Sequence, residues 1–456
     1  MAENWKAGLK DRIFQKETIS ELARNLTFVL PHVRNSILSK DQAKARLGNE
    51  KSAKEGKLRV SYNKDTRELC LFLFDEQGTE PISGLMLELS SDPDASDVKF
   101  CKDFLRVFNA DVLSAPSILS DKELWTTLQQ TRFARAIGRF SPFSTENFMR
   151  WLHVVESAGS LRYEGHPFAA CIFMTKQMSW VESSSALEFI KFESLMRFEE
   201  AVLKEKWTRA LLRDPLIGLV GLSLQGSIVG VATFKASAVS GVTFAPHEEL
   251  IPIASAVVPG TMAFVSSLHG DLYILFPNGA TFVKSQGRWR YFNYSSLTKI
   301  VGRLVPSEIA QGLVRVILDL SYERKGGLIV ILPNETKIEK VIPDHLVVSR
   351  SNGALRKFSQ GLKIEDASHR RVLTSGAGID GAIVVSGDGR VMDCACMIGE
   401  PSLPDCKNIG KTGLQKFAGA RTTAAWNASV YGVAIKISED GPITIFEKGN
   451  IVLQLG

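Results

Sequence analysis

Two stretches near the C-terminal end of the chain carry residue types that can bind a phosphorylated ligand. Asp380 stands before an uncharged β-branched run, which a Gly-Asp-Gly turn joins to a second run at Arg390–Met397. Runs of this kind on either side of a tight turn predict two strands of a hairpin. Further along, Gly419–Thr423 gathers small residues, two hydroxyls and an arginine before an Ala-rich segment. This is the make-up of a helix N-terminus that holds an anion.

Each of these residues also has a plainer interpretation. An aspartate before a glycine at the entrance of a strand commonly caps a turn, which would explain Asp380 without a ligand. An isolated arginine beside a helix start is commonly a surface ion pair. Arg421, however, stands among amides and hydroxyls that converge on one point, and this setting favours anion binding.

The order of these stretches resembles a known family. Asp380-Gly381-Ala382, a hairpin, a Gly-x-Arg loop that opens a helix and a strand that ends at Ile437-Ser438-Glu439 are similar to the diadenylate cyclase (DAC) domain. That domain carries a DGA motif and a G-T-R-H-R-x-A motif in the same order. The segment Leu320–Ile331 looks like the family's first helix and first core strand. The resemblance covers residues 305–456 and implies a mixed-sheet, nucleotide-binding α/β domain used in bacterial signalling.

The chain departs from the family in the second motif. Where the family has Thr-Arg-His-Arg, this sequence has Ala420-Arg421-Thr422-Thr423, so one arginine remains. In the family these basic side chains hold the triphosphate and the leaving pyrophosphate, and such catalysis depends on positioning and electrostatic stabilisation. The resemblance therefore favours a sensor that binds an adenine nucleotide or a cyclic dinucleotide without making it. Two alternatives stay open: an active diadenylate cyclase that makes cyclic di-AMP from two ATP, and a structural scaffold without a ligand.

The resemblance also implies roles for individual residues. Asp380 would meet a ribose hydroxyl or a divalent cation, Mg or Mn, with help from Glu439, and it would be catalytic if the cyclase is active. Arg421 and the helix-start amides would meet phosphate oxygens. The expected nucleotide-binding residues are Asp380, Gly381, Ala382, Gly419, Ala420, Arg421, Thr422, Thr423, Ser438 and Glu439.

Composition sets broad limits on the whole chain. The 456 residues are 45% hydrophobic and 23% charged, which is typical of a globular protein of two or three domains. A formal net charge of +6, from 55 basic and 49 acidic residues, permits an anionic ligand, but it lacks the concentrated basic patch of nucleic-acid-binding proteins. Six cysteines and no secretory signal predict reduced thiols and a cytoplasmic location.

The pattern of the chain predicts three regions of an α/β protein: an α+β region at 1–160, an α/β region with hairpins at 161–304 and the DAC-like domain at 305–456. Leu69–Phe74 is expected to be a buried strand and Leu187–Leu212 a long helix. The uncharged stretch 215–234 is long enough to cross a membrane, but Gly226 favours two strands and no membrane contact. If the chain forms a homo-oligomer, we expect it to do so through its N-terminal helices.

Two motifs near the expected site look functional, but a plainer interpretation suits each better. Gly410-Lys411-Thr412 copies the end of a phosphate-binding P-loop, yet Asp405 stands where the first glycine belongs. Cys394, Cys396 and Cys406 have the residue type of a zinc site, but no histidine lies near them in sequence. We expect a variable loop and buried thiols at these positions.

Overall fold

The computed structural model describes residues 19–26, 30, 32–47, 59–75, 80–89, 92–118, 122–159, 161–163, 166–167, 170–212, 214, 216–222, 226–235, 245–343, 358–377 and 381–455. The chain divides into two compact units. Unit 1 consists of Met1–Phe244 and Glu249–Asn293, and unit 2 of Ala245–Glu248 and Tyr294–Gly456. Both units combine helices with β-sheet, so the chain is an α/β protein. The three-region division expected from the sequence stays a prediction.

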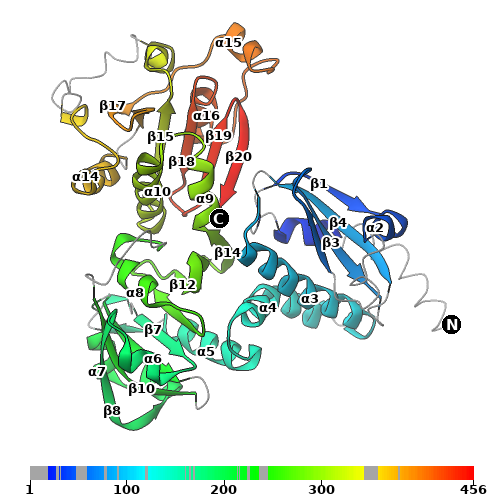
Figure 1. The fold of residues 1–456 in the computed structure, drawn as a ribbon, viewed down its shortest axis with the longest axis vertical. Helices are drawn as coiled ribbons and strands as arrows, with labels where there is room; N and C mark the ends of the chain where they lie inside the picture. Colours follow the sequence, from blue (N-terminus) through cyan, green and yellow to red (C-terminus); the bar gives the residue numbers. More distant parts are fainter. Residues whose placement is uncertain are drawn as a thin grey trace. The chain divides into compact units, whose positions relative to one another are not determined.

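Unit 1 begins with a small antiparallel sheet (Figure 1). Its elements are β1 (His32–Leu38), α2 (Lys40–Leu47), β2 (Val60–Asn63), β3 (Glu68–Phe74) and β4 (Pro81–Leu89), and the described strands lie in the order β1-β4-β3-β2. The buried strand expected at Leu69–Phe74 is confirmed, because every one of these residues is buried. Alternate side chains of β3 face the main core of the unit and a smaller cluster that includes Ala43 and Leu47 of α2.

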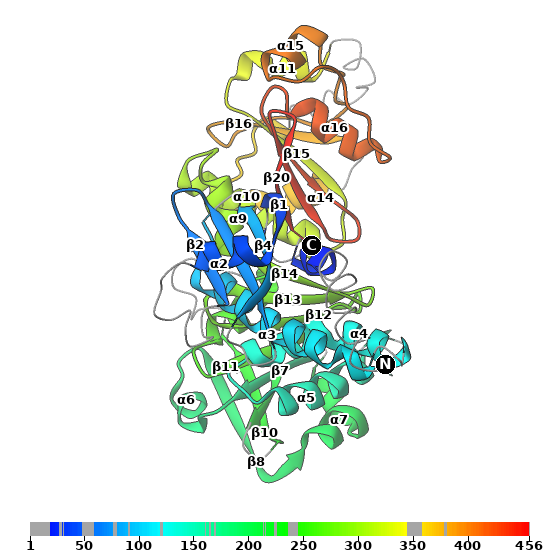
Figure 2. The ribbon, with the colours of Figure 1, turned by 90° about the vertical axis from the view of Figure 1, so that its right-hand side faces the viewer.

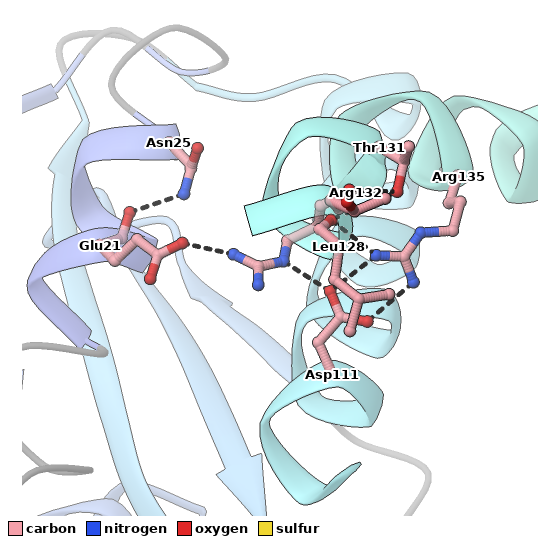
Figure 3. Close-up of polar contacts among 8 residues, drawn as sticks. Glu21, Asn25, Asp111, Leu128, Thr131, Arg132 and Arg135 are labelled. Carbon is pink, nitrogen blue, oxygen red and sulfur yellow. Dashed lines mark hydrogen bonds and ion pairs between the residues drawn. The ribbon is translucent and has the colours of Figure 1, made fainter. Parts of the chain in front are cut away.

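Helices α3 (Ala95–Ile118), α4 (Lys122–Phe140) and α5 (Thr145–Ala158) follow, and an ion cluster joins the first two. Asp111 of α3 accepts hydrogen bonds from Arg132 Nε at 2.7 Å and from Arg135 Nη1 and Nη2 at 2.7 and 2.8 Å. Arg132 also donates to Glu21 in the helical residues 19–26, at 2.5 Å (Figure 3). The side chains of Asp111 and Arg132 are 4% and 2% exposed, so these charges are compensated inside the unit and not by water.

The larger sheet of unit 1 has eight strands in its described part, in the order β14-β13-β12-β11-β7-β9-β10-β8. These strands are β7 (Ala170–Thr175), β8 (Leu187–Arg197), β9 (Ile217–Leu222), β10 (Ser227–Phe234), β11 (Thr261–Ser266), β12 (Leu272–Leu275), β13 (Ala280–Ser285) and β14 (Arg288–Asn293). Strands β7 and β9 pair in parallel and the other neighbours are antiparallel. The shorter elements are β5 (Arg162–Tyr163), β6 (His166–Pro167), α6 (Met178–Ser183), η2 (Glu200–Lys204), α7 (Lys206–Leu211), η4 (Glu248–Leu250), α8 (Ile251–Ala256) and η5 (Pro277–Gly279).

The helix expected over Leu187–Leu212 is wrong in its first half. Leu187–Arg197 is strand β8, which pairs antiparallel with β10, and only the short helices η2 and α7 follow it. Apolar residues at Phe189, Phe192 and Met196 are compatible with a helical period. The alternation that would reveal a strand is weak because β8 is an edge strand with most side chains exposed. Backbone pairing with β10 makes this segment a strand and not a helix.

The uncharged stretch 215–234 forms a hairpin, as expected. Strands β9 and β10 pair antiparallel, and Gly226, with φ of 59°, lies in the turn between them. Across the ranges that the structure describes, no helix combines the length and the apolar character that crossing a membrane requires.

Unit 2 is built on a mixed sheet whose described strands lie in the order β17-β16-β15-β18-β19-β20 (Figures 1 and 2). The strands are β15 (Gly327–Leu332), β16 (Ala382–Ser386), β17 (Val391–Cys396), β18 (Val433–Ile437), β19 (Ile443–Glu447) and β20 (Asn450–Leu455). The helices are α9 (Tyr294–Val301), α10 (Ser307–Tyr322), η6 (Glu335–Lys337), α11 (Ile338–Val341), α14 (Ala367–Ala377), α15 (Leu403–Asn408) and α16 (Ala420–Ala428). Strands β15 and β16 are parallel, and the other neighbours are antiparallel. The first four strands in chain order were expected from the sequence and are confirmed.

Helices cover both faces of this sheet. On one face, Leu328, Val330 and Ala434 pack in one buried cluster with Trp426 of α16. On the other face, a Cβ at Gly327 would lie 3.3 Å from Leu320 of α10, and α14 also contacts this strand. The helix expected before the first strand is confirmed, because Leu320 and the other apolar residues of α10 are buried. The start of α16 therefore lies on the face of the sheet that carries Leu328, Val330 and Ala434.

Candidate functional site

The start of α16 is open to solvent. Gly419 is the N-cap residue, with extended backbone angles (φ −105°, ψ 131°), and among the described residues no side chain caps the helix. The first N–H groups of any α-helix lack partners within the helix, and here Ala420, Arg421 and Thr422 carry them. No acidic residue stands in the first turn to occupy the positive end of the helix dipole. An anion therefore has donors and a favourable field at this point.

Thr423 shapes the loop that leads into the helix. Its hydroxyl accepts the Phe417 N–H at 3.0 Å and lies 3.4 Å from the Phe417 carbonyl oxygen and 3.3 Å from that of Gly419. These contacts tie residues 417–419 to the first turn of α16. The hydroxyl is thus already engaged, and the anion-binding groups that remain in this turn are the helix-start amides, the Thr422 hydroxyl and Arg421.

Arg421 reaches from the first turn of α16 to the start of β15. A Cβ at Gly326 would lie 2.2 Å from Arg421 Nη1 and 2.8 Å from Glu439 Cγ, so the guanidinium occupies the space that a side chain would fill. Arg421 Nη1 lies 3.5 Å from Glu439 Oε1, and the two side chains are 28% and 78% exposed. A long ion pair with one partner in water stabilises little. The guanidinium is therefore positioned by its surroundings yet available to a stronger anion.

A second cation, Lys436, lies on the same face of the sheet. Lys436 pairs with Leu328 of β15 and Thr444 of β19, and it is two residues from Ala434, which packs in the cluster that contains α16. Burial lowers the pKa of Lys436, and repulsion from Arg421 lowers it further, whereas Asp440 acts in the opposite direction. Within the described ranges no hydrogen bond or ion pair joins the side chain of Lys436 to another residue. Arg421 and Lys436 thus place two positive charges near the start of α16.

The sequence analysis did not identify Lys436. Its one local signal is that it is the only charged residue in the run Val433–Ser438. A lone lysine in a strand is usually an outward-facing solvated residue, so the run by itself gives no reason to single it out.

Gly381 and Ala382 lie where β16 begins. Gly381 has φ of 121°, and a Cβ there would lie 2.5 Å from the carbonyl carbon of Ala395, so glycine is required by both backbone angle and space. Ala382 is buried and pairs with Cys396 of β17. Asp380, the preceding residue of the expected site, lies outside the described residues. Because β15 and β16 run in parallel, both begin at the end of the sheet that Arg421 contacts.

Ser438 and Glu439 lie in the turn after β18. The Ser438 N–H donates to the Pro442 carbonyl at 2.8 Å, and the Gly441 N–H donates to the Ser438 carbonyl at 2.9 Å. Ser321, at the end of α10, donates its hydroxyl to the Gly441 carbonyl at 2.6 Å. The turn is therefore fixed to α10, and Glu439 extends from it toward solvent and Arg421.

Phe417 is a further feature that sequence reasoning missed. Its ring is 36% exposed and packs edge-on against Phe446 of β19, with 6.2 Å between ring centroids. Thr423 holds its backbone N–H, as described above. An aromatic ring that is held in place beside an anion-binding helix start is a surface on which a base can stack.

The described residues do not form a metal site. No group of three or more His, Cys, Asp or Glu side chains among them is arranged to hold a metal ion. All six cysteines are free thiols, including Cys394, Cys396 and Cys406. Of the two expected ligands of a divalent cation, only Glu439 is described, and its nearest cation is Arg421. Carboxylates suit Mg or Mn, and Asp380, the other expected ligand, lies outside the described residues.

Lys411, the lysine of the P-loop-like triplet, is engaged elsewhere. Its ammonium group donates to Asn450 Oδ1 at 2.6 Å, and Asn450 is the first residue of β20. The triplet therefore anchors the loop before α16 to an edge strand.

A comparison of the chain with protein-family models finds no match, and a comparison with curated proteins finds none either.

Proposed function

We propose that unit 2 is a DAC-like domain that binds a phosphorylated adenine nucleotide at the start of α16 and acts as a sensor. The observation that carries this proposal is the placement of Arg421 and Lys436 beside an uncapped helix start. Helix-start amides bind phosphate, and two cations strengthen the attraction with charge-assisted hydrogen bonds. The exposed ring of Phe417 supplies a stacking surface for the base.

The positions of the expected segments support the DAC-like assignment. Gly381 immediately precedes β16, Ser438–Glu439 follows the end of β18, and Gly419–Thr423 forms the N-cap and first turn of α16. Strand β18 is antiparallel to β15, and β16 is parallel to it, so the end of β18 and the start of β16 lie at the same end of the sheet. Arg421 reaches this end at Gly326. Three segments that are distant in the sequence thus surround one site.

Binding without catalysis agrees better with the side chains than turnover does. Thr422 and Thr423 stand where the family has a histidine and a second arginine, and the Thr423 hydroxyl is bonded to the loop. A cyclase must stabilise the charge of a triphosphate and of a leaving pyrophosphate. With two cations, Arg421 and Lys436, the cradle suits a ligand of lower charge, such as a mononucleotide or a cyclic dinucleotide.

Calorimetry with AMP, ATP and cyclic di-AMP tests this function. Arg421→Ala is expected to weaken binding by about 1.5 to 3 kcal/mol, or roughly 10- to 150-fold, because it removes a charged hydrogen bond. Asp380→Ala tests the expected contribution of Asp380, which lies outside the described residues, to nucleotide binding. Arg390→Ala is the matched control, since Arg390 lies after β16, at the far end of that strand, and forms hydrogen bonds of 2.8 and 3.0 Å with Glu335.

Each outcome of this experiment separates the alternatives. Equal losses in Arg421→Ala and Arg390→Ala, or unchanged affinity in both site variants, would refute the site. Formation of cyclic di-AMP from ATP with Mg or Mn would replace the sensor by an active cyclase. If none of the three nucleotides binds, a structural scaffold without a ligand is the interpretation that remains. Self-association through the N-terminal helices stays a prediction, which light scattering at micromolar concentration tests.

A further inference from the structure

We infer that Lys436 and Arg421 grip one phosphate together, and that the site therefore selects a terminal phosphate monoester, as in a nucleoside 5′-monophosphate, over the phosphodiester of a cyclic nucleotide. This inference rests on the proposed function, because it names the ligand class of the same site. It goes further by assigning a specificity role to a lysine of strand β18 that is not among the nucleotide-binding residues expected from the resemblance.

Strand pairing places the two cations together. Arg421 reaches Gly326, which immediately precedes β15, and Lys436 lies across from Leu328 in the same strand. Leu328 belongs to the buried cluster that α16 covers, so Lys436 is on the face where α16 begins. The two side chains thus approach one point from different elements, one from the helix start and one from the sheet beneath it.

The free-energy cost of keeping the half-buried Lys436 in its charged form points to a bound anion. Lys436 is half-buried, and no direct partner of its side chain lies in the described part of the chain; burial is the main effect that lowers its pKa, Asp440 raises it, and the nearby Arg421 guanidinium has the smallest effect and lowers it. The acidic groups nearby, Glu439 and Asp440, are exposed and lie in the turn beyond the end of β18. The attraction of Asp440 offsets the repulsion from Arg421, so what chiefly disfavours the charged form of Lys436 is burial of its ammonium group. An anion placed between Arg421 and Lys436 would give this ammonium group a direct partner.

The number of charges and oxygens indicates which anion fits. A phosphate monoester carries about −1.5 to −2 charges near pH 7 and presents three acceptor oxygens. A phosphodiester carries one negative charge and has two oxygens that are free of ester bonds. Three kinds of donor converge here, namely the Arg421 guanidinium, the Lys436 ammonium and the amides of the α16 start. A monoester offers each kind of donor a separate oxygen and nearly twice the negative charge, whereas in a diester two kinds of donor must share one oxygen.

A pair of ligands that differ only at the phosphate tests the inference. AMP and 3′,5′-cyclic AMP share base, ribose and a single phosphate, but the first is a monoester and the second a diester. Wild-type protein is expected to bind AMP at least about tenfold more tightly, since a charged hydrogen bond contributes that much or more. Lys436→Met, which keeps an apolar stem of similar length, is expected to reduce this preference to about twofold or less by weakening AMP binding. Lys299→Met, at an exposed position on α9, should leave it unchanged.

Acidification supplies a second readout, in which the ligand titrates and the lysine does not. The second pKa of a phosphate monoester is about 6, so AMP becomes a monoanion as the pH falls from about 7.5 to 5. Wild-type preference for AMP over cyclic AMP should then disappear, and Lys436→Met should show little change over the same range. Circular dichroism checks that Lys436→Met is folded, and binding of cyclic AMP by this variant checks that the site is intact.

The outcomes distinguish this inference from the proposed function. If Lys436→Met keeps the wild-type preference for AMP while Arg421→Ala abolishes binding, the role of Lys436 is overturned and nucleotide binding stands. Tighter binding of cyclic AMP or cyclic di-AMP than of AMP also overturns the monoester selection. Absence of binding by every nucleotide overturns both.

Discussion

Replacing Asp111 by asparagine should cost unit 1 much of its stability. Asp111 is 4% exposed and accepts three hydrogen bonds from Arg132 and Arg135. Asparagine keeps the shape but presents one acceptor oxygen, and its amide hydrogens would face guanidinium groups. Breaking a buried ion pair by removing one charge typically costs about 3 to 5 kcal/mol, because the partner remains buried without compensation. We expect a loss in this range, since Arg132 is 2% exposed and cannot turn to water.

Asp103 on the same helix offers a matched control. Its side chain is 8% exposed and also pairs with two cations, Lys99 at 3.1 Å and Arg106 at 3.4 Å, but these are 51% and 49% exposed. Pairs with exposed partners contribute about 0 to 1 kcal/mol, so Asp103→Asn should cost roughly 1 kcal/mol or less. The comparison isolates the burial of the cationic partners, because residue type, helix and aspartate burial are nearly the same.

The assay must report on α3 and α4 themselves, because two compact units need not unfold together. Native-state hydrogen exchange followed by mass spectrometry gives the opening free energy of these helices, and urea unfolding gives that of the whole chain. A difference of about 3 kcal/mol between the two variants would appear as roughly a hundredfold faster exchange in Asp111→Asn, where opening is rapidly reversed. Equal exchange in the two variants would refute the argument that burial of Arg132 makes the cluster critical.

Three further predictions concern unit 2. Gly326→Ala should weaken AMP binding about as much as Arg421→Ala, with little loss of stability, because its Cβ would displace the guanidinium; an unchanged affinity in calorimetry would contradict the placement of Arg421. AMP affinity should fall at alkaline pH, beginning below the ordinary lysine pKa of about 10.4, because burial lowers the pKa of Lys436 by more than Asp440 raises it; Lys436→Met should lack this fall. Burial and a hydrogen bond to Asp405 raise the pKa of Tyr431 from 10.0 to about 12, so its contribution to stability is present below pH 10 and is lost as the pH rises through about 12. In an alkaline titration followed by tyrosine absorbance, Tyr431→Phe should show one fewer tyrosine that ionises late than wild type does. Identical titration curves for the two proteins would contradict the raised pKa of Tyr431.

The sequence predicted best where a segment's own residues decide its structure. Ala382–Ser386 is an uncharged run and Val433–Ile437 carries one charge, Lys436; both are rich in β-branched residues with turn residues beside them, and both are strands. The apolar period of Ser307–Tyr322 matches the buried face of a helix, and the structure has α10 there. By contrast, β8 exposes most of its side chains, so its structure depends on pairing with β10 and its own pattern misled the prediction.

The same distinction applies to the candidate site: some of its residues could be predicted from their own segment, and others could not. Gly419–Thr423 has the composition of a helix start, and α16 begins there. Phe417 carries no local signal, and the lone charge of Lys436 in its strand does not single it out. Each is brought to this helix start by a neighbouring strand, Lys436 by the pairing of β18 with β15 and Phe417 by its contact with Phe446. No spacing rule along one chain contains that information. Sequence patterns thus find sites that are built from consecutive residues and miss residues that strand register supplies.

The adjacent glycines Gly326 and Gly327 explain how the start of β15 serves both the core and the site. Neither has a positive φ, so glycine is needed here for space and not for an unusual backbone conformation. A Cβ at Gly327 would lie 3.3 Å from Leu320 and from the Ala377 carbonyl, against α10 and α14, whereas a Cβ at Gly326 would meet Arg421 at 2.2 Å. Successive residues at the start of a strand face opposite sides, so one glycine admits the helices of the core and the other admits the guanidinium. Because the space for Arg421 exists without any change in the packing of α10 and α14, an anion can bind between Arg421 and Lys436 while the sheet keeps its arrangement.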